Sequence, residues 1–542
     1  MNQTFWQGRR VLITGHTGFK GSWLSLCLQS LGAKVLGYAH KPPTQPNLFN
    51  LASVASGITS VLGDVCDREH LRQVVEDFKP EIVFHMAAQA IVRESYNKPV
   101  ETYATNVMGT VHLLDAVRHA ENVRAVVIIT SDKCYENREW VWGYRENEAM
   151  GGYDPYSSSK GCAEIVTAGY RNSFFNPQNH SKHGVAIATA RAGNVIGGGD
   201  WAKDRLIPDI LRSLLKEETI IIRNPLAIRP WQHVLEPLNG YMKLAERLYQ
   251  DGPAYSEGWN FGPYESGVKP VSWVVDELIS LWDTNISWKQ DEAYQPHEDT
   301  YLTLDCAKAR AKLGWKPAID LNTALYWTVE WMKAYQTGAD MRRMTETQIN
   351  RFMEIARVAE ILPATFGAQS KQKKAAAWED RLQLLELIHA TAMGRNMEGV
   401  IAFWNRGAEK MYGWRKNEAI GRVSHTLLNT QFPKPLQEIE TELLQKRLWE
   451  GELIHTTRSG KRLTVKSSWV LHPDHHHNSE NVLEINTILI SKRGKGLQSV
   501  VISSMWALTS ITEALNGLQS VVQSVVISSM WALTSVAEAL AV

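Results

Sequence analysis

The stretch RVLITGHTGFKGSWLSLCLQ (residues 10–29) decides the fold of the first part of the chain. It opens with a short, apolar, β-branched run, which is the pattern of a buried strand, and it closes with an amphipathic run typical of a helix. Between them, Gly15, Gly18 and Gly21 follow the spacing G-x-x-G-x-x-G. Glycines let the backbone approach a pyrophosphate, which then lies at the N-terminus of the helix. The stretch therefore predicts a strand, a dinucleotide-binding turn and a helix.

Alternating strand and helix patterns continue as far as residue 130. Apolar runs predict strands at 34–39, 58–62, 81–85 and 125–130, and helical patterns cover 68–78 and 99–118. Such alternation is typical of an α/β fold with a Rossmann-type, doubly wound parallel sheet. Ligands of these sheets bind beyond the carboxyl ends of the strands, so the residues directly after Thr130 should face the ligand.

Reactive side chains gather after this last predicted strand. Ser131, Asp132 and Lys133 follow it directly, and Tyr156 and Lys160 lie one helical turn apart further along. A free phenol has a pKa of about 10 and is a poor base at neutral pH. The Lys160 ammonium, together with an oxidised nicotinamide, would favour the phenolate. The pair therefore indicates a base for hydride transfer, and Ser131 can hydrogen-bond the same substrate oxygen.

With these motifs in place, residues 1–355 resemble the extended short-chain dehydrogenase/reductase family, and within it the CDP-glucose 4,6-dehydratases. The segments that carry the resemblance are GHTGFKGSWL (15–24), PEIVFHMAAQ (80–89), ETYATNVMGTVHLL (101–114), ITSDKCYENREWVWGYRENE (129–148), GGYDPYSSSKGCAE (151–164), RAGNVIGGGDWAKDRLIPD (191–209) and IRPWQHVLEPL (228–238). The resemblance implies a Rossmann domain with a smaller C-terminal substrate lobe, built mainly from residue 175 onward.

The implied reaction oxidises C4 of a hexose, removes water across C5 and C6, and returns the hydride to C6. The product would be a 4-keto-6-deoxy sugar for deoxysugar and O-antigen biosynthesis. Tyr156 would take the C4 hydroxyl proton. Asp132 would be the acid for the C6 hydroxyl, which requires burial to raise its pKa. Lys133 stands where dTDP-glucose dehydratases have a glutamate base; it could remove the C5 proton as a free amine, or stay charged and stabilise the enolate.

The resemblance also implies a tightly bound NAD, CDP-glucose as substrate, and a homodimer formed through helices at 99–118 and 156–174. NADP stays open, because His40 and Lys41 stand where NAD enzymes place a carboxylate for the ribose. The expected cofactor contacts are Gly15, Thr17, Gly18, Phe19, Gly21, Asp64, Ala87, Tyr156 and Lys160. The expected substrate contacts are Asn194, Arg205, Arg229 and His233.

The last third of the chain does not continue the strand–helix alternation of the first part. Residues 356–387 are polar and basic and predict a helical linker. Residues 388–495 resemble a PAS domain, an α+β fold that would bind a small ligand or a protein partner. His389, His425 and His455 are isolated in the sequence, which disfavours a haem site. Residues 496–542 hold a near-perfect repeat and are expected to be poorly ordered.

Composition narrows the class of function. The net charge of +1 gives no general field for nucleic acid or an anionic membrane. The five cysteines fit no metal pattern and suit a reducing compartment. The N-terminus lacks the apolar run of a signal peptide, and no apolar run is long enough for a membrane span. A cytoplasmic protein without a metal, membrane or nucleic-acid partner is therefore expected.

Two other functions stay open. One is a 4-epimerase or another nucleotide-sugar dehydratase on the same fold. The other is a PAS-type signalling protein whose first part only binds nucleotide. Asp132 and Lys133 argue for dehydration, because an epimerase needs the Tyr156–Lys160 pair but has no use for an adjacent acid and amine.

Overall fold

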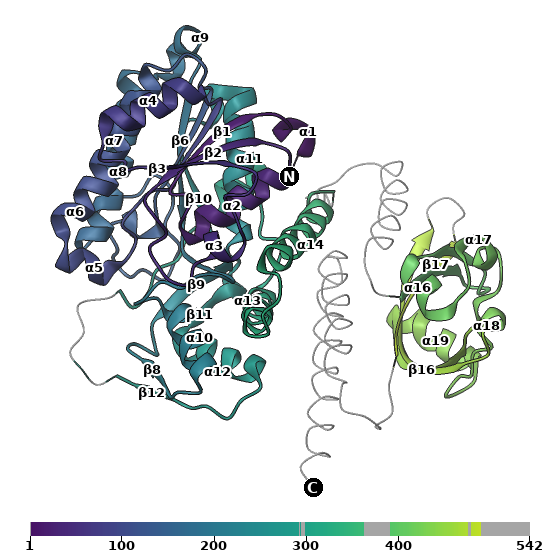
Figure 1. The fold of residues 1–542 in the computed structure, drawn as a ribbon. Helices are drawn as coiled ribbons and strands as arrows, with labels where there is room; N and C mark the ends of the chain where they lie inside the picture. The colour runs from purple at the N-terminus through teal and green to yellow at the C-terminus, as the bar shows by residue number, and fades with distance from the viewer. Residues whose placement is uncertain (1, 292, 294–298, 362–390, 475–478, 489–542) are drawn as a thin grey trace. The chain divides into compact units, whose positions relative to one another are not determined.

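The computed structural model describes residues 2–291, 293, 299–361, 391–474 and 479–488. The chain divides into two compact units, Met1–Ile361 and Leu362–Val542 (Figure 1). Most of the linker expected at 356–387 and the whole repeat at 496–542 lie outside the described residues. Residues 356–361 form the end of a helix, α14 (Met341–Ile361).

Seven parallel strands form the central sheet of the first unit, in the order β10-β6-β5-β4-β1-β2-β3. This confirms the predicted doubly wound sheet. The strands are β1 (Arg10–Thr14), β2 (Lys34–Ala39), β3 (Thr59–Leu62), β4 (Ile82–His85), β5 (Ala125–Ile129), β6 (Ala186–Ala192) and β10 (Gly258–Phe261).

Helices cover both faces of the sheet (Figure 1). Alternate residues of a strand point to opposite faces, so Val11 and Ile13 pack in one core with α2 (Phe19–Ser30) and α11 (Leu235–Asp251). Leu12 packs in the other core, with α4 (Arg68–Phe78) and α7 (Gly109–Arg118). α8 (Pro155–Ser173) lies next to α7 on this second face.

The helix expected at 99–118 is present but is not regular. It consists of α6 (Pro99–Tyr103), a π-helical turn (Ala104–Met108) and α7. A Cβ atom at Gly109 would lie 2.6 Å from Cγ2 of Val65, so the glycine lets this helix approach the segment after β3.

The smaller lobe contains two small sheets, β11-β9-β7 and β12-β8. It is not continuous in sequence, because β6, α11 and β10 come after residue 175 and yet belong to the central sheet and its cover. The remaining elements of this unit are α1 (Gln3–Trp6), α3 (Leu48–Leu51), α5 (Val92–Asn97), α9 (His180–His183), β7 (Asn194–Ile196), α10 (Leu206–Lys216), β8 (Ile220–Ile222), β9 (Ile228–His233), β11 (Val268–Pro270), α12 (Val271–Trp282), β12 (Trp288–Gln290) and α13 (Leu321–Gln336).

The second unit has the expected α+β fold. Its antiparallel sheet has the order β14-β13-β17-β16-β15. Asn405 caps α16 by accepting a hydrogen bond from the backbone of Ala408, as its position before the helical pattern predicts. The bounds are β13 (Thr391–Asn396), β14 (Ile401–Trp404), α16 (Arg406–Tyr412), α17 (Lys416–Ala419), α18 (Ser424–Leu427), α19 (Leu436–Lys446), β15 (Leu448–Thr456), β16 (Arg462–Asp474) and β17 (Ser479–Ile488).

His425 and His455, which are isolated in the sequence, have close partners in the folded unit. Nδ1 of His455 hydrogen-bonds the Tyr412 hydroxyl, and its Nε2 lies 4.0 Å from the Glu484 carboxylate. Glu484 in turn pairs with Arg395 at 3.4 Å, with both side chains almost fully buried. The ring of His425 stacks on that of Trp469. Sequence separation hid this cluster, because its members come from different elements of the unit.

None of the helices in the described residues is long and apolar enough to cross a membrane. The same residues contain no cluster of His, Cys, Asp or Glu side chains that could hold a metal ion.

A buried ion pair ties α8 to the sheet. Glu164 of α8 accepts hydrogen bonds from Nε and Nη2 of Arg191 on β6, both at 2.8 Å, and from the hydroxyls of Thr130 and Thr189. Burial disfavours the charged carboxylate, but Arg191 and the two hydroxyls outweigh it, so the pKa of Glu164 is lowered.

Replacing Glu164 by alanine should destabilise the first unit by about 3–5 kcal/mol, because the Arg191 guanidinium would stay buried without its partner. Urea unfolding near pH 7 measures the effect. A group with a lowered pKa stabilises the fold above its unfolded-state pKa and loses that effect as pH falls. The difference between wild type and variant should therefore shrink below the ordinary Glu value of 4.5. Glu164→Leu combined with Arg191→Met should cost less than Glu164→Ala; an equal or larger cost would contradict this account.

Candidate active site

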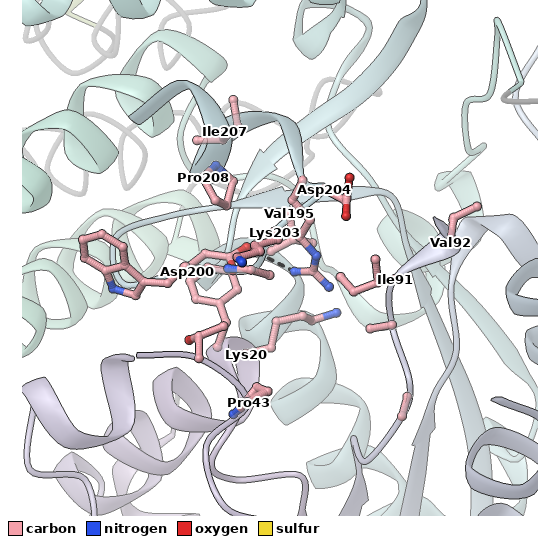
Figure 2. A pocket seen from close by; sticks show the side chains of 18 of the residues that line it. Lys20, Pro43, Ile91, Val92, Val195, Asp200, Lys203, Asp204, Ile207 and Pro208 are labelled. Carbon is pink, nitrogen blue, oxygen red and sulfur yellow. Dashed lines mark hydrogen bonds and ion pairs between the residues drawn. The ribbon is translucent and has the colours of Figure 1, made fainter. Parts of the chain in front are cut away.

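A cavity of about 1560 Å³ lies at the carboxyl ends of the central strands (Figure 2). Its walls come from the turn after β1, the segments after β4 and β5, the start of α8, and the lobe residues around β7, α10 and β9. The structure therefore brings together most of the side chains that the sequence singled out. Those that line the cavity are Gly15, Thr17, Gly18, Phe19, Gly21, Ala87, Ser131, Asp132, Lys133, Tyr156, Lys160, Asn194, Arg205 and Arg229.

The glycine turn is shaped for a close backbone approach. Gly15 has a φ of +79°, and a Cβ atom there would lie 2.7 Å from the backbone nitrogen of Ala87. A Cβ atom at Gly21 would lie 2.1 Å from the carbonyl oxygen of Gly15. Gly18 is the N-cap of α2 and offers no side-chain cap, so the first N–H groups of the helix stay open to an anion. These features fit the pyrophosphate of a dinucleotide.

Burial prepares Asp132 for an acid role. The residue follows β5 in a short 3₁₀ turn (Asp132–Cys134) and is 4% exposed. Its Oδ1 accepts a hydrogen bond of 2.9 Å from the Ser131 hydroxyl. Burial raises the pKa of Asp132, although Lys133, Ser131 and Arg229 oppose the rise. The direction is the one that a proton donor needs.

Tyr156 and Lys160 lie on the first turns of α8. The helix begins with Pro155, and Asp154 caps it by accepting a hydrogen bond of 2.9 Å from the backbone of Ser157. Burial raises the pKa of Tyr156 to about 12, while a hydrogen bond with Ser131 and the charge of Arg205 act in the opposite direction. Burial lowers the pKa of Lys160 to about 8, and its Nζ donates to the carbonyl of Ile129 at 3.3 Å. In the protein without a cofactor, burial is the largest influence on the pKa of both groups. It acts against the charged phenolate and ammonium that the sequence leads one to expect.

Asp299 is a residue of the site that the sequence did not reveal. Its carboxylate lies 3.6 Å from Nζ of Lys133, and both side chains are largely buried. Arg229 holds the same residue by donating to its backbone carbonyl. Asp299 lies in no recognisable motif, and only the folding of the lobe brings it to β5.

Two further residues of the site were missed. Asp200 forms an ion pair of 3.1 Å with Arg205, which fixes the guanidinium beside the cavity. Lys20 was read only as part of the glycine turn, yet its side chain enters the cavity (Figure 2). The sequence pattern places Lys20 in the glycine turn, whereas the structure places it in the first turn of α2.

Two predicted residues are not among those lining the cavity. His233 is fully buried between Trp23 and Trp327, with ring centroids 5.8 and 5.5 Å away. Burial lowers the pKa of His233 to about 3, so its ring is neutral and does not offer a charge to a phosphate. Asp64 accepts a hydrogen bond of 2.8 Å from the backbone of Cys66 and pairs with His40 at 3.3 Å. Its neighbours Gly63 and Val65 line the cavity in its place.

Comparisons with known proteins identify relatives of both units. The profile of the family described as GDP-mannose 4,6 dehydratase matches residues 12–328, and that of the PAS fold matches residues 379–481. A CDP-glucose 4,6-dehydratase of Salmonella typhimurium is 59% identical over 353 residues, which are 65% of this chain and 98% of that protein. A dTDP-glucose 4,6-dehydratase of the same organism is 24% identical over 350 residues, 60% of this chain and 93% of that protein.

Solved structures share the fold of the first unit. A dTDP-glucose 4,6-dehydratase from Bacillus anthracis in complex with NAD has a TM-score of 0.51 at 22% identity, over 62% of this chain and 100% of that chain. A UDP-glucose 4-epimerase from Thermotoga maritima with UDP-glucose also has a TM-score of 0.51 at 22% identity, over 60% of this chain and 99% of that chain.

Gly21→Ala should weaken dinucleotide binding at least tenfold (about 1.4 kcal/mol), because the added methyl group would push α2 away from Gly15. Titration calorimetry with NAD, after removal of bound nucleotide, measures the change. Gly169→Ala is the matched control: Gly169 is exposed on α8 and has no atom within 4 Å of the added Cβ. Equal affinities of Gly21→Ala and Gly169→Ala would contradict the assignment of the turn.

Proposed function

The chain belongs to the GDP-mannose 4,6-dehydratase family, and we propose that it is an NAD-dependent CDP-glucose 4,6-dehydratase with an appended PAS fold. It would convert CDP-D-glucose to CDP-4-keto-6-deoxy-D-glucose and water. The observation that carries the proposal is the buried Asp132 beside Lys133, facing the same cavity as Tyr156 and Lys160. The 59% identity to a CDP-glucose 4,6-dehydratase, over 98% of that relative, supports the choice of substrate.

Residues of β5 and α8 would serve the oxidation at C4. When bound, NAD supplies an acceptor for the hydride of C4 and later returns it to C6. Tyr156 takes the proton of the C4 hydroxyl, and Ser131 hydrogen-bonds the same oxygen. A bound nicotinamide would add positive charge to the cavity, which would oppose the effect of burial on the Tyr156 phenol and favour the phenolate. Lys160, one helical turn after Tyr156 on α8, would bind the cofactor and add its own positive charge.

The C4 ketone makes the C5 proton acidic, so the water between C5 and C6 can then be eliminated. Asp132 gives its proton to the C6 hydroxyl as that group leaves, and its burial supports this acid role. Lys133, paired with Asp299, is a charged group that can stabilise the negative oxygen of the enolate. The elimination needs this acid and this cation together, whereas a 4-epimerase would use neither.

Basic and amide groups of the lobe would hold the nucleotide diphosphate. Arg229 and Arg205 each present a guanidinium fork, which matches two phosphate oxygens. Asn194 can donate an amide hydrogen bond. Arg205 forms an ion pair with Asp200, and Arg229 donates a hydrogen bond to the backbone carbonyl of Asp299. These contacts hold both arginines at the cavity wall.

We also propose a homodimer formed through the helices on one flank of the sheet. Several large apolar side chains are exposed on these helices and their π-helical turn, where a single chain leaves them in water. They are Val100, Tyr103, Met108, Ile165 and Phe174, the last at the C-cap of α8. For the PAS unit we propose a small ligand or a protein partner, and for the whole chain a cytoplasmic location, which the five free cysteines suit.

The test of the proposed function is incubation of the purified protein with CDP-glucose. A 4-keto product, which absorbs in alkali, should form, while UDP-, GDP- and dTDP-glucose should react at least tenfold more slowly. Formation of CDP-galactose in place of a keto sugar would point to an epimerase. No reaction with any nucleotide sugar would favour a protein that only binds nucleotide.

Variants should separate the two halves of the reaction. Tyr156→Phe should lose the whole reaction, by about 10²- to 10⁴-fold, because it removes the base for C4 oxidation. Asp132→Asn should still oxidise C4 but lose dehydration by a similar factor, so that reduced nicotinamide builds up. Rapid-mixing absorbance measures the reduced nicotinamide, and chromatography measures the product. A fully active Asp132→Asn would contradict the acid role.

Ile165→Glu should turn the dimer into a monomer, because a charge would replace an apolar side chain that is 62% exposed on α8. Light scattering after size-exclusion chromatography gives the mass. Leu226→Glu is the matched control, since Leu226 is 79% exposed but lies outside these helices. A dimer that survives Ile165→Glu would show that another surface forms the interface.

A further inference from the structure

The loop of residues 137–144 lies between the 3₁₀ turn after β5 and the start of α8, and the proposed reaction gives it no task. Its backbone has a conformation that is unfavourable for most side chains, because Glu139 has a φ of +53°, in the left-handed region that favours glycine. The Asn137 side chain holds this turn by accepting hydrogen bonds of 3.0 Å from the backbone of Glu139 and from the Tyr144 hydroxyl. A backbone held in this way suggests a function for the side chain that it presents.

Glu139 holds the lobe segment that lies against this loop. Its Oε1 accepts hydrogen bonds from the backbone nitrogen of Thr300 and, at 2.7 Å, from the Thr300 hydroxyl. A second contact joins the same two segments, since Nδ2 of Asn137 donates to the carbonyl of Tyr301 at 3.1 Å. The loop therefore clamps the lobe segment directly after Asp299.

Asp299 is in this way held beside Lys133. Its own carbonyl accepts a hydrogen bond from the Arg229 guanidinium. On its other side, the carbonyl of Thr300 accepts a hydrogen bond of 2.8 Å from the backbone of Ile228. With its backbone fixed at both ends, Asp299 places its carboxylate 3.6 Å from Nζ of Lys133. Both side chains line the cavity, so the clamp reaches the site through a single residue.

The Lys133 side chain benefits from such support because it is a flexible four-carbon stem that ends in a compact polar group. In the proposed reaction its Nζ acts on the sugar carbon next to the one that Asp132 serves. A displacement of about 1 Å at a reacting centre can lower a rate by about 10²-fold. An ion pair with a fixed carboxylate restricts the stem to the orientations that keep Nζ in place.

We propose that Glu139 and Asp299 are positioning residues for the elimination step. Glu139 fixes Asp299 through Thr300, and Asp299 fixes Nζ of Lys133 at the sugar. This inference rests on the proposed dehydratase function and adds to it two residues that act through Lys133. The position of Nζ matters equally for removal of the C5 proton and for stabilisation of the enolate.

Rapid mixing with CDP-glucose separates oxidation from elimination. Asp299→Ala should form reduced nicotinamide at close to the wild-type rate and then lose product formation by about 10²-fold, with little change in KM. Glu139→Ala should lose about tenfold in the same step, because its effect on Nζ is indirect. Glu139→Gln keeps an acceptor for Thr300 and should recover most of that loss. Glu136→Ala is the matched control, since Glu136 is 52% exposed near the same loop and pairs with Arg138; it should behave as wild type.

Combination with a Lys133 variant shows whether the two residues act through that lysine. Lys133→Met has no amine to orient, so adding Asp299→Ala or Glu139→Ala should lower its slow product formation no further. Independent structural damage would add to the loss. For the same reason, Glu139→Ala combined with Asp299→Ala should equal Asp299→Ala alone. Thermal unfolding compares the stability of the variants with that of wild type.

Three results would overturn the assignment. One is normal product formation by Asp299→Ala. Another is an Asp299→Ala variant that fails to form reduced nicotinamide, which would place Asp299 in substrate binding. The third is an additive loss in the Lys133→Met background, which would show a general structural role. Failure of the proposed function itself would look different, because wild type would then give no 4-keto product.

Discussion

Exclusion of water from the carboxyl ends of β5 and its neighbours is the constraint on which the chemistry of this protein depends. Burial is the largest influence on four groups around the cavity. It raises the pKa of Asp132 and of Tyr156, and it lowers the pKa of Lys160 and of Lys20. Each of these groups is thereby pushed toward its uncharged form, and for Asp132 this is the form that a proton donor needs.

Backbone geometry places these groups within one cavity. Parallel strands end at the same edge, so the residues after β1, β4, β5 and β6 meet there. The glycines of the turn after β1 let α2 pack close to that edge. On the other face, the Glu164–Arg191 ion pair holds α8 against the sheet. The lobe then closes the cavity with Arg229 and Asp299.

Local patterns were enough to predict the sheet, the glycine turn and the placement of Tyr156 and Lys160. Apolar strands, glycine spacing and a one-turn helical separation are all readable over a few residues. The position of Asp299 was not readable, because it depends on a lobe segment that is far in sequence from Lys133. The burial of His233 was not readable either: the motif around it is clear, but two tryptophans from α2 and α13 enclose its ring. The buried cluster at Glu484 likewise comes from strands that pair only in the folded PAS unit.

The most direct measurement of the central claim follows one hydrogen atom. The account holds that a single cavity oxidises C4, eliminates water and reduces C6 of the same sugar. CDP-glucose that carries deuterium at C4 should therefore give a 4-keto-6-deoxy product with that deuterium at C6, as seen by nuclear magnetic resonance and mass spectrometry. Deuterium returned to C4 of an epimerised sugar, or deuterium lost to solvent, would contradict the account.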